Sequence, residues 1–156
     1  MLKFKSYIEE EIKYHDPKHD AEHDEVRTQL GVPKGAYPDH VVKQLQKLSN
    51  KKNYVSAMKN AKTTYVHHKD KDLGKMGNTD AADKRGIHKN PDIEKEKRDR
   101  VNSQWKKAKK GEGSIEKPII LHHKETGHKH LLAGNTRLTS GVQDQKTKVA
   151  VHTIEY

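Results

Sequence analysis

The chain has 156 residues, of which 30% are hydrophobic and 35% are charged, so any folded core is small. Thirty-two lysines and arginines outnumber 22 aspartates and glutamates, and the formal charge of +10 favours polyanionic partners such as nucleic acid. The absence of cysteine excludes disulfides, and without an apolar run of about 18 residues or a signal peptide we expect a cytoplasmic protein with no membrane partner.

The first expected element is an amphipathic helix over the opening stretch "MLKFKSYIEEEIKY", residues 1–14. Phe4, Ile8 and Ile12 recur there at four-residue spacing, and acidic residues lie between them. Such a helix either packs onto the rest of the chain or docks on a protein partner or a membrane, and packing is the more common use.

Three histidines follow this helix at four-residue spacing, each directly before an aspartate: His15, His19 and His23. On a helix they would share one face, and imidazole and carboxylate groups bind zinc and similar ions. However, Pro17 is compatible only with the first turn of a helix, which leaves His15 outside it. A solvated polar face is the favoured interpretation, and no metal ligand is assigned.

Two short helices are expected next, after the loop "GVPKGAYPD" at residues 31–39, in which Asp39 is positioned to cap the first of them. The apolar residues of each helix fall on one face: Val41, Val42, Leu45 and Leu48, then Tyr54, Val55, Met58 and Ala61. A hairpin around residues 50–53 would bury both faces. We therefore assign residues 1–62 to a helical region, whose helices also offer a surface for a protein partner.

Residues 63–91 predict a loop-rich linker. Glycines interrupt this segment, its apolar residues are isolated, and only an extended stretch around Tyr65 and Val66 is expected. Pro91 then precedes a helix with acidic residues in its first turns and lysines in its last, as the helix dipole favours.

This later helix carries the most concentrated basic patch of the chain: Lys106, Lys107, Lys109 and Lys110. Because Trp105 lies beside the patch, these five residues are candidates for gripping a nucleic-acid backbone. The alternative is equally favoured: Val101, Trp105 and Ala108 share a face that docks on the protein, and the lysines are a solvated back. The helix and all that follows form the predicted unit 92–156.

The last part of the chain predicts a strand, a turn, a strand, a short helix and a strand. "KPIILHH" and "HKHLLAG" are apolar runs separated by the turn "ETG", and "KVAVHTIEY" is the final strand. After the second run comes "GNTRLTSG", in which Gly134, Asn135 and Thr136 let backbone N–H groups face an anion at a helix N-terminus. Arg137 adds a charged fork for that anion. Alternatively the turn is structural, and Arg137 pairs with Glu116 or Glu155.

The runs "EKPIIL", "GHKHLLAGNTRLT" and "KVAVHTIEY" together resemble the core of the ParB/sulfiredoxin-like superfamily, in its phage branch of ParB-like nuclease domains. In that superfamily a glycine and an arginine at this turn serve a nucleotide's phosphates, and Gly134 and Arg137 correspond to them. The resemblance covers residues 116–156 only. It implies a small mixed-sheet core in a phage-encoded protein of the bacterial cytoplasm. Together with the N-terminal helical region that the residue patterns predict, this gives an α+β fold.

The resemblance also implies a function in nucleotide or nucleic-acid phosphate binding, with a nucleoside triphosphate and Mg²⁺ as the expected cofactor. If the protein is a nuclease or uses a nucleotide, Glu116 and His130 are the candidates for activating water or positioning a metal ion. Sulfinic acid reduction is excluded because there is no cysteine. The alternatives are a non-catalytic DNA-binding module and a phage structural or host-inhibitory protein that binds its partner through the N-terminal helices.

Overall fold

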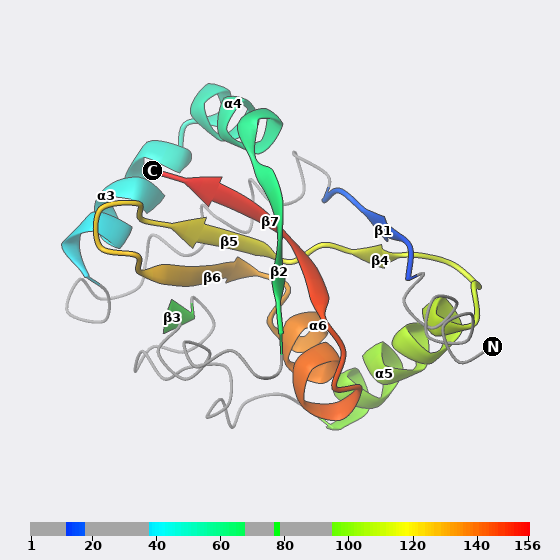
Figure 1. Cartoon of the computed structure of the whole chain (residues 1–156). Coiled ribbons are helices and arrows are strands. Elements are labelled where there is room, and N and C mark those ends of the chain that lie inside the picture. Colours follow the sequence, from blue (N-terminus) through cyan, green and yellow to red (C-terminus); the bar gives the residue numbers. More distant parts are fainter. Residues whose placement is uncertain (1–11, 18–37, 68–76, 79–94) are drawn as a thin grey trace.

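A computed structural model of the chain describes residues 12–17, 38–67, 77–78 and 95–156 (Figure 1). This part of the chain is an α+β fold, as expected, in which helices cover both faces of a five-stranded mixed sheet. Residues 1–11 of the expected first helix and the histidines His19 and His23 lie outside the described residues. Residues 12–14, at the expected end of that helix, are not helical, because Tyr14 pairs with Ile115 as a strand.

The strands of the main sheet are β2 Lys62–Val66, β3 Gly77–Asn78, β5 Ile119–His122, β6 Lys129–Ala133 and β7 Val149–Glu155. Their order in the sheet is β2-β7-β5-β6-β3. β7 pairs antiparallel with β2 and parallel with β5, β5 and β6 form an antiparallel hairpin, and β3 runs parallel to β6. A separate parallel pair joins β1 Tyr14–His15 to β4 Ile115–Glu116.

The C-terminal order of strand, turn, strand, short helix and strand is confirmed. β7 lies inside the sheet, and six of its seven residues are buried because helices cover both faces. The extended stretch expected around Tyr65 and Val66 is also confirmed, as β2 at the sheet edge, where only Val66 is buried. The start of the predicted linker is therefore part of the sheet, and β3, which the sequence did not predict, adds the other edge strand.

One face of the sheet is covered by two helices, α3 Asp39–Leu48 and α4 Lys51–Asn60. Asn50 caps α4, since its side chain accepts a hydrogen bond from the Asn53 N–H. The prediction that Asp39 caps α3 is wrong by one position: Pro38 precedes the helix without a side-chain cap, and Asp39 is its first residue. There the carboxylate still suits the positive end of the helix dipole.

The apolar faces of these two helices pack against the sheet as well as against each other. Their buried residues Leu45, Tyr54 and Met58 belong to the same cluster as Leu121 and Ile154 of the sheet. α4 ends at Asn60 and the predicted boundary at residue 62 falls on the first residue of β2, while the core on this side is built by segments from both sides of that boundary.

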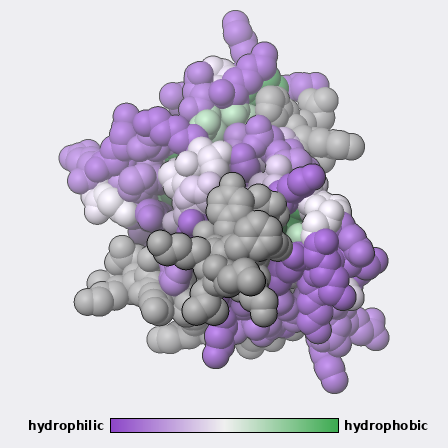
Figure 2. All heavy atoms as spheres, turned by 45° about the vertical axis from the view of Figure 1, so that its right-hand side comes forward, coloured by the Kyte–Doolittle hydropathy of each residue, from purple (hydrophilic) through white to green (hydrophobic). Residues whose placement is uncertain are grey.

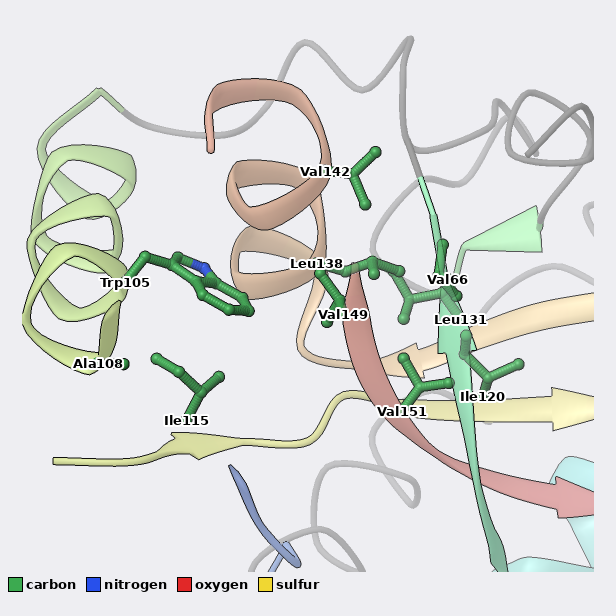
Figure 3. Packing of buried hydrophobic residues seen from close by; sticks show 10 residues of the cluster. All are labelled: Val66, Trp105, Ala108, Ile115, Ile120, Leu131, Leu138, Val142, Val149 and Val151. Carbon is green, nitrogen blue, oxygen red and sulfur yellow. The ribbon is translucent and has the colours of Figure 1, made fainter. Parts of the chain in front are cut away.

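The opposite face is covered by α5 Lys95–Lys109, α6 Asn135–Thr139 and a π-helix, η4 Ser140–Asp144. Trp105 is fully buried here, between α5 and α6, in the cluster of Figure 3, and its indole N–H donates to the Arg137 carbonyl oxygen at 3.2 Å. Gly141 allows η4 to approach, because a Cβ atom there would lie 2.6 Å from the Trp105 ring. On the surface, Arg98 and Asn102 of α5 bind Asp144.

Hydrophilic residues dominate the described surface in the view of Figure 2, with small apolar patches among them. Tyr65 is the large hydrophobic residue most exposed in the described ranges, at 54%, and the Lys148 ammonium lies 4.7 Å from the centre of its ring. No helix of the described part of the chain is both long and apolar enough to span a bilayer.

Candidate phosphate-binding site

The turn between β6 and α6, residues 134–137, has the conformation that the sequence predicts for a strand-to-helix junction. Gly134 lies in the left-handed region at φ 86°, and its carbonyl accepts the first helical hydrogen bond, from the Leu138 N–H at 2.9 Å. A Cβ atom at this position would lie 2.9 Å from the Pro118 Cα, well inside van der Waals contact. Glycine is thus required here twice, by its backbone angle and by the closeness of the β4–β5 connection.

Arg137 of this turn is held by Glu116. One guanidinium nitrogen lies 3.1 Å from the Glu116 carboxylate and the other donates to the Glu116 carbonyl oxygen, also at 3.1 Å. Both side chains are about one-quarter exposed, at 25% and 26%. The ion pair that the structural alternative predicted is therefore present. Because a guanidinium has five N–H donors, these two contacts leave further donors at the surface.

The two residues between Gly134 and Arg137 are turned into the fold. Asn135 is 8% exposed and Thr136 is 6% exposed, and the Thr139 hydroxyl lies 3.4 Å from the Asn135 side-chain oxygen. Of the four residues predicted to bind phosphate, Gly134 and Arg137 are thus the ones with appreciable exposure. Arg137 is therefore the side chain of this turn that is most exposed to solvent.

A second cluster of polar residues, which we did not predict from the sequence, lies next to the turn. Lys117 binds the Asp16 carboxylate at 2.7 Å and the Thr63 hydroxyl at 2.8 Å. Asp16 also lies 3.7 Å from Nδ1 of His152, a buried residue whose Nε2 donates to the Met58 carbonyl oxygen at 2.9 Å. Two features of the sequence could have indicated this cluster: Lys117 stands almost directly before a buried strand, and His152 lies within the apolar final strand.

His130 does not join Glu116 and Arg137, so the predicted catalytic pair is not assembled. It pairs across the hairpin with Leu121, whose cluster lies under α3 and α4, whereas Leu138 of α6 belongs to the cluster on the other face. His130 is fully buried, and burial lowers its pKa to about 3, helped by the neighbouring His128 and His40. The sheet therefore separates His130 from the arginine, and Glu116 is the predicted catalytic residue that remains beside the turn.

The basic helix also requires a correction. Trp105 is 0% exposed, so its ring is not available to stack on a base, and its place among the nucleic-acid contacts was wrong. Lys109 is half-buried and donates to Gln145 at 3.0 Å, and burial lowers its pKa. The exposed part of the patch is Lys106, Lys107 and Lys110. The alternative interpretation of α5 is confirmed, because the helix docks through its apolar face and keeps these lysines at the solvent-exposed back.

Histidines gather at the other end of the β5–β6 hairpin. The rings of His40 and His123 stack with centroids 4.1 Å apart, the His128 ring lies edge-on at 5.2 Å, and the Tyr156 hydroxyl binds His40 Nδ1 at 2.8 Å. Burial and the adjacent His123 lower the pKa of His40. Within the described ranges no three His, Asp or Glu side chains are arranged to hold a metal ion. His15 lies in β1 and contacts Ser114 at 2.7 Å.

Acidification should therefore destabilise the protein through His130. The unfolded chain takes up a proton near pH 6.5, whereas folded His130 does so only near pH 3, so stability is complete above pH 6.5 and is lost as the pH falls toward 3. The slope is at most about 1.4 kcal/mol per pH unit for one such group. Urea unfolding between pH 7.5 and 4 should be less pH-dependent in His130→Leu than in the wild type, and unchanged in the control His15→Gln. An equal slope in His130→Leu would contradict the assignment.

No protein-family model matches the chain, and comparisons with curated proteins and with solved structures gave no significant match. The resemblance of residues 116–156 to the ParB/sulfiredoxin-like superfamily thus rests on the sequence motifs alone.

Proposed function

We propose that the chain is a ParB-like protein that binds the phosphate of a nucleotide or nucleic acid at the 134–137 turn. The observation that carries the proposal is the position of Arg137: its guanidinium is part-exposed in the first turn of a helix that begins directly after a left-handed glycine. Helix N-termini favour anions, and an arginine fork matches phosphate geometry. The formal charge of +10 adds attraction over a longer range.

Glu116 competes with a phosphate for the Arg137 guanidinium. Its carboxylate lies 3.1 Å from the Arg137 guanidinium, so an incoming phosphate either displaces it or shares the arginine with it. A carboxylate beside a bound phosphate repels it unless a cation lies between them, and Mg²⁺ is commonly held by one or two carboxylates together with substrate phosphates. Glu116 is therefore the residue that would hold Mg²⁺ on a nucleoside triphosphate. Its carboxylate also offers a proton acceptor beside the turn for a hydrolytic reaction.

The test is a thermal-shift panel of CTP, ATP, ADP and short DNA, with and without Mg²⁺, in the wild type and in Arg137→Ala. A ligand at a hundredfold excess over its dissociation constant stabilises the folded state by about 2.7 kcal/mol. We expect one nucleotide to raise the melting temperature of the wild type, and the rise to disappear in Arg137→Ala. The control Arg100→Ala removes an exposed arginine of α5 and should keep the full shift.

Two outcomes of this panel would contradict the proposal. If no nucleotide and no DNA stabilises the wild type, the 134–137 turn binds no phosphate. If DNA stabilises the wild type and Arg137→Ala equally, the turn is structural and the alternative of a non-catalytic DNA-binding module is favoured. In that case the exposed lysines Lys106, Lys107 and Lys110 supply the contacts, and their replacement by glutamine should weaken binding and reduce its salt dependence.

A further inference from the structure

A cavity of about 380 Å³ opens between α3, α4 and the C-terminal end of β7, which lie side by side in Figure 1. Its polar lining includes three carboxamides, from Gln44, Asn53 and Asn60. Its apolar lining includes Leu48 and Ile154, which are both almost fully buried. The volume falls in the range of roughly 300–1,000 Å³ that is typical of small-molecule sites. We call this cavity the amide pocket.

Gln44 is the unusual member of this lining. It is only 9% exposed, yet its carboxamide makes no hydrogen bond to another residue described by the structure. Neither its side-chain nitrogen nor its side-chain oxygen is among the fully buried atoms that lack a partner, so both remain open to solvent. Because Gln44 lines the amide pocket, the donor and acceptor of its side chain are presented to whatever occupies that space.

The charges of the amide pocket favour a neutral occupant. The pocket lining carries one basic and one acidic residue, Lys47 and Glu155. The Lys62 ammonium also lies 2.8 Å from the Glu155 carboxylate and holds the pKa of Glu155 below its ordinary value. A carboxylate that remains ionised accepts N–H donors, and carboxamides both donate and accept. This combination, beside apolar residues that can lie against a flat ring, is complementary to the hydrogen-bonding edge of a nucleobase.

We propose that the amide pocket is a binding site for a nucleobase, recognised by the carboxamides of Gln44 and its neighbours and by the carboxylate of Glu155. The site does not include the 134–137 turn. Glu155 adjoins His122 at the end of β5, whereas Gly134 lies against Pro118 just before β5 begins. The pocket also lies on the α3–α4 face, and α6 packs on the other face. Base binding here therefore needs no phosphate and no contribution from Arg137.

The test uses ligands without phosphate. The full chain is titrated with adenosine, guanosine, cytidine and uridine, and binding is followed by calorimetry and by NMR shifts of the side-chain amides. We expect at least one nucleoside to bind, with shifts at the Gln44 side chain, and Gln44→Leu to weaken that binding by about tenfold or more. Leucine preserves the size of a buried side chain, so this variant should fold.

The matched control is Gln46→Leu, which changes an exposed glutamine of the same helix, α3, and should leave binding unchanged. Arg137→Ala should also bind the nucleoside as the wild type does. The proposal is overturned if no nucleoside binds, if Gln44→Leu binds as well as the wild type, or if binding is lost in Arg137→Ala. Failure of the phosphate proposal would instead leave nucleoside binding intact and remove only the nucleotide-specific shift at the turn.

Discussion

Replacing Trp105 with alanine should lower the free energy of unfolding by about 3–5 kcal/mol, because the change empties the centre of a well-packed cluster. The side chain is 0% exposed, projects from α5 onto α6, and donates its indole N–H to the Arg137 carbonyl oxygen. Urea unfolding followed by far-UV circular dichroism measures the effect, since the variant loses the single tryptophan of the chain as a fluorescent probe.

Two further variants make this prediction specific. Trp105→Phe keeps a ring but loses the N–H, and it should cost about 1–3 kcal/mol. Lys106→Ala, at the next and exposed position of α5, should change stability by no more than about 0.5 kcal/mol. If Trp105→Ala were as stable as Lys106→Ala, the ring would not be in the core, and a stacking role on nucleic acid would have to be reconsidered.

Gly134→Ala should be the second severe change, with a loss of about 2–5 kcal/mol. An alanine at φ 86° adopts a left-handed conformation that is unfavourable for any residue with a Cβ atom. The same Cβ atom would also lie 2.9 Å from Pro118, whose backbone is fixed by the β4–β5 connection. Thermal and urea unfolding measure the loss directly.

Gly127→Ala is the matched control for this change. Gly127 also has a positive φ, of 75°, but a Cβ atom there meets nothing within 4 Å. Its replacement should therefore cost only the conformational part, about 1–2 kcal/mol. The difference between the two variants isolates the close packing of the 134–137 turn on Pro118. Equal losses would mean that the turn tolerates a side chain and is not held tightly beside β4.

Candidate site residues that are close together in the sequence lie on opposite sides of the sheet. Glu116, His130 and Arg137 fall within 22 residues of one another in the printed chain, and nothing in their spacing reveals which face each will take. The hairpin register decides it, because His130 opposes Leu121 while Arg137 projects from α6 to Glu116. One residue of register would move a strand's side chains to the other face.

Local patterns were sufficient to predict most of the elements. Helical spacing of Leu45 and Leu48 predicted α3, and the apolar runs on either side of "ETG" predicted the β5–β6 hairpin. The turn at Gly134 was also predictable, since a glycine between a strand pattern and a helix start is a local signal. By contrast, β3 was not predicted: it has two residues, and its pairing with β6 is a contact across the chain rather than a local preference.

The sequence by itself determined the α+β class, the cores of the helices and strands, and the identity of the residues at the 134–137 turn, because periodicity and turn chemistry are properties of neighbouring residues. Only the tertiary structure decided that Trp105 is buried, that Glu116 holds Arg137, and that Gln44 faces a cavity. Burial and pairing depend on which segments meet across the sheet, and those contacts join residues that are far apart in the chain.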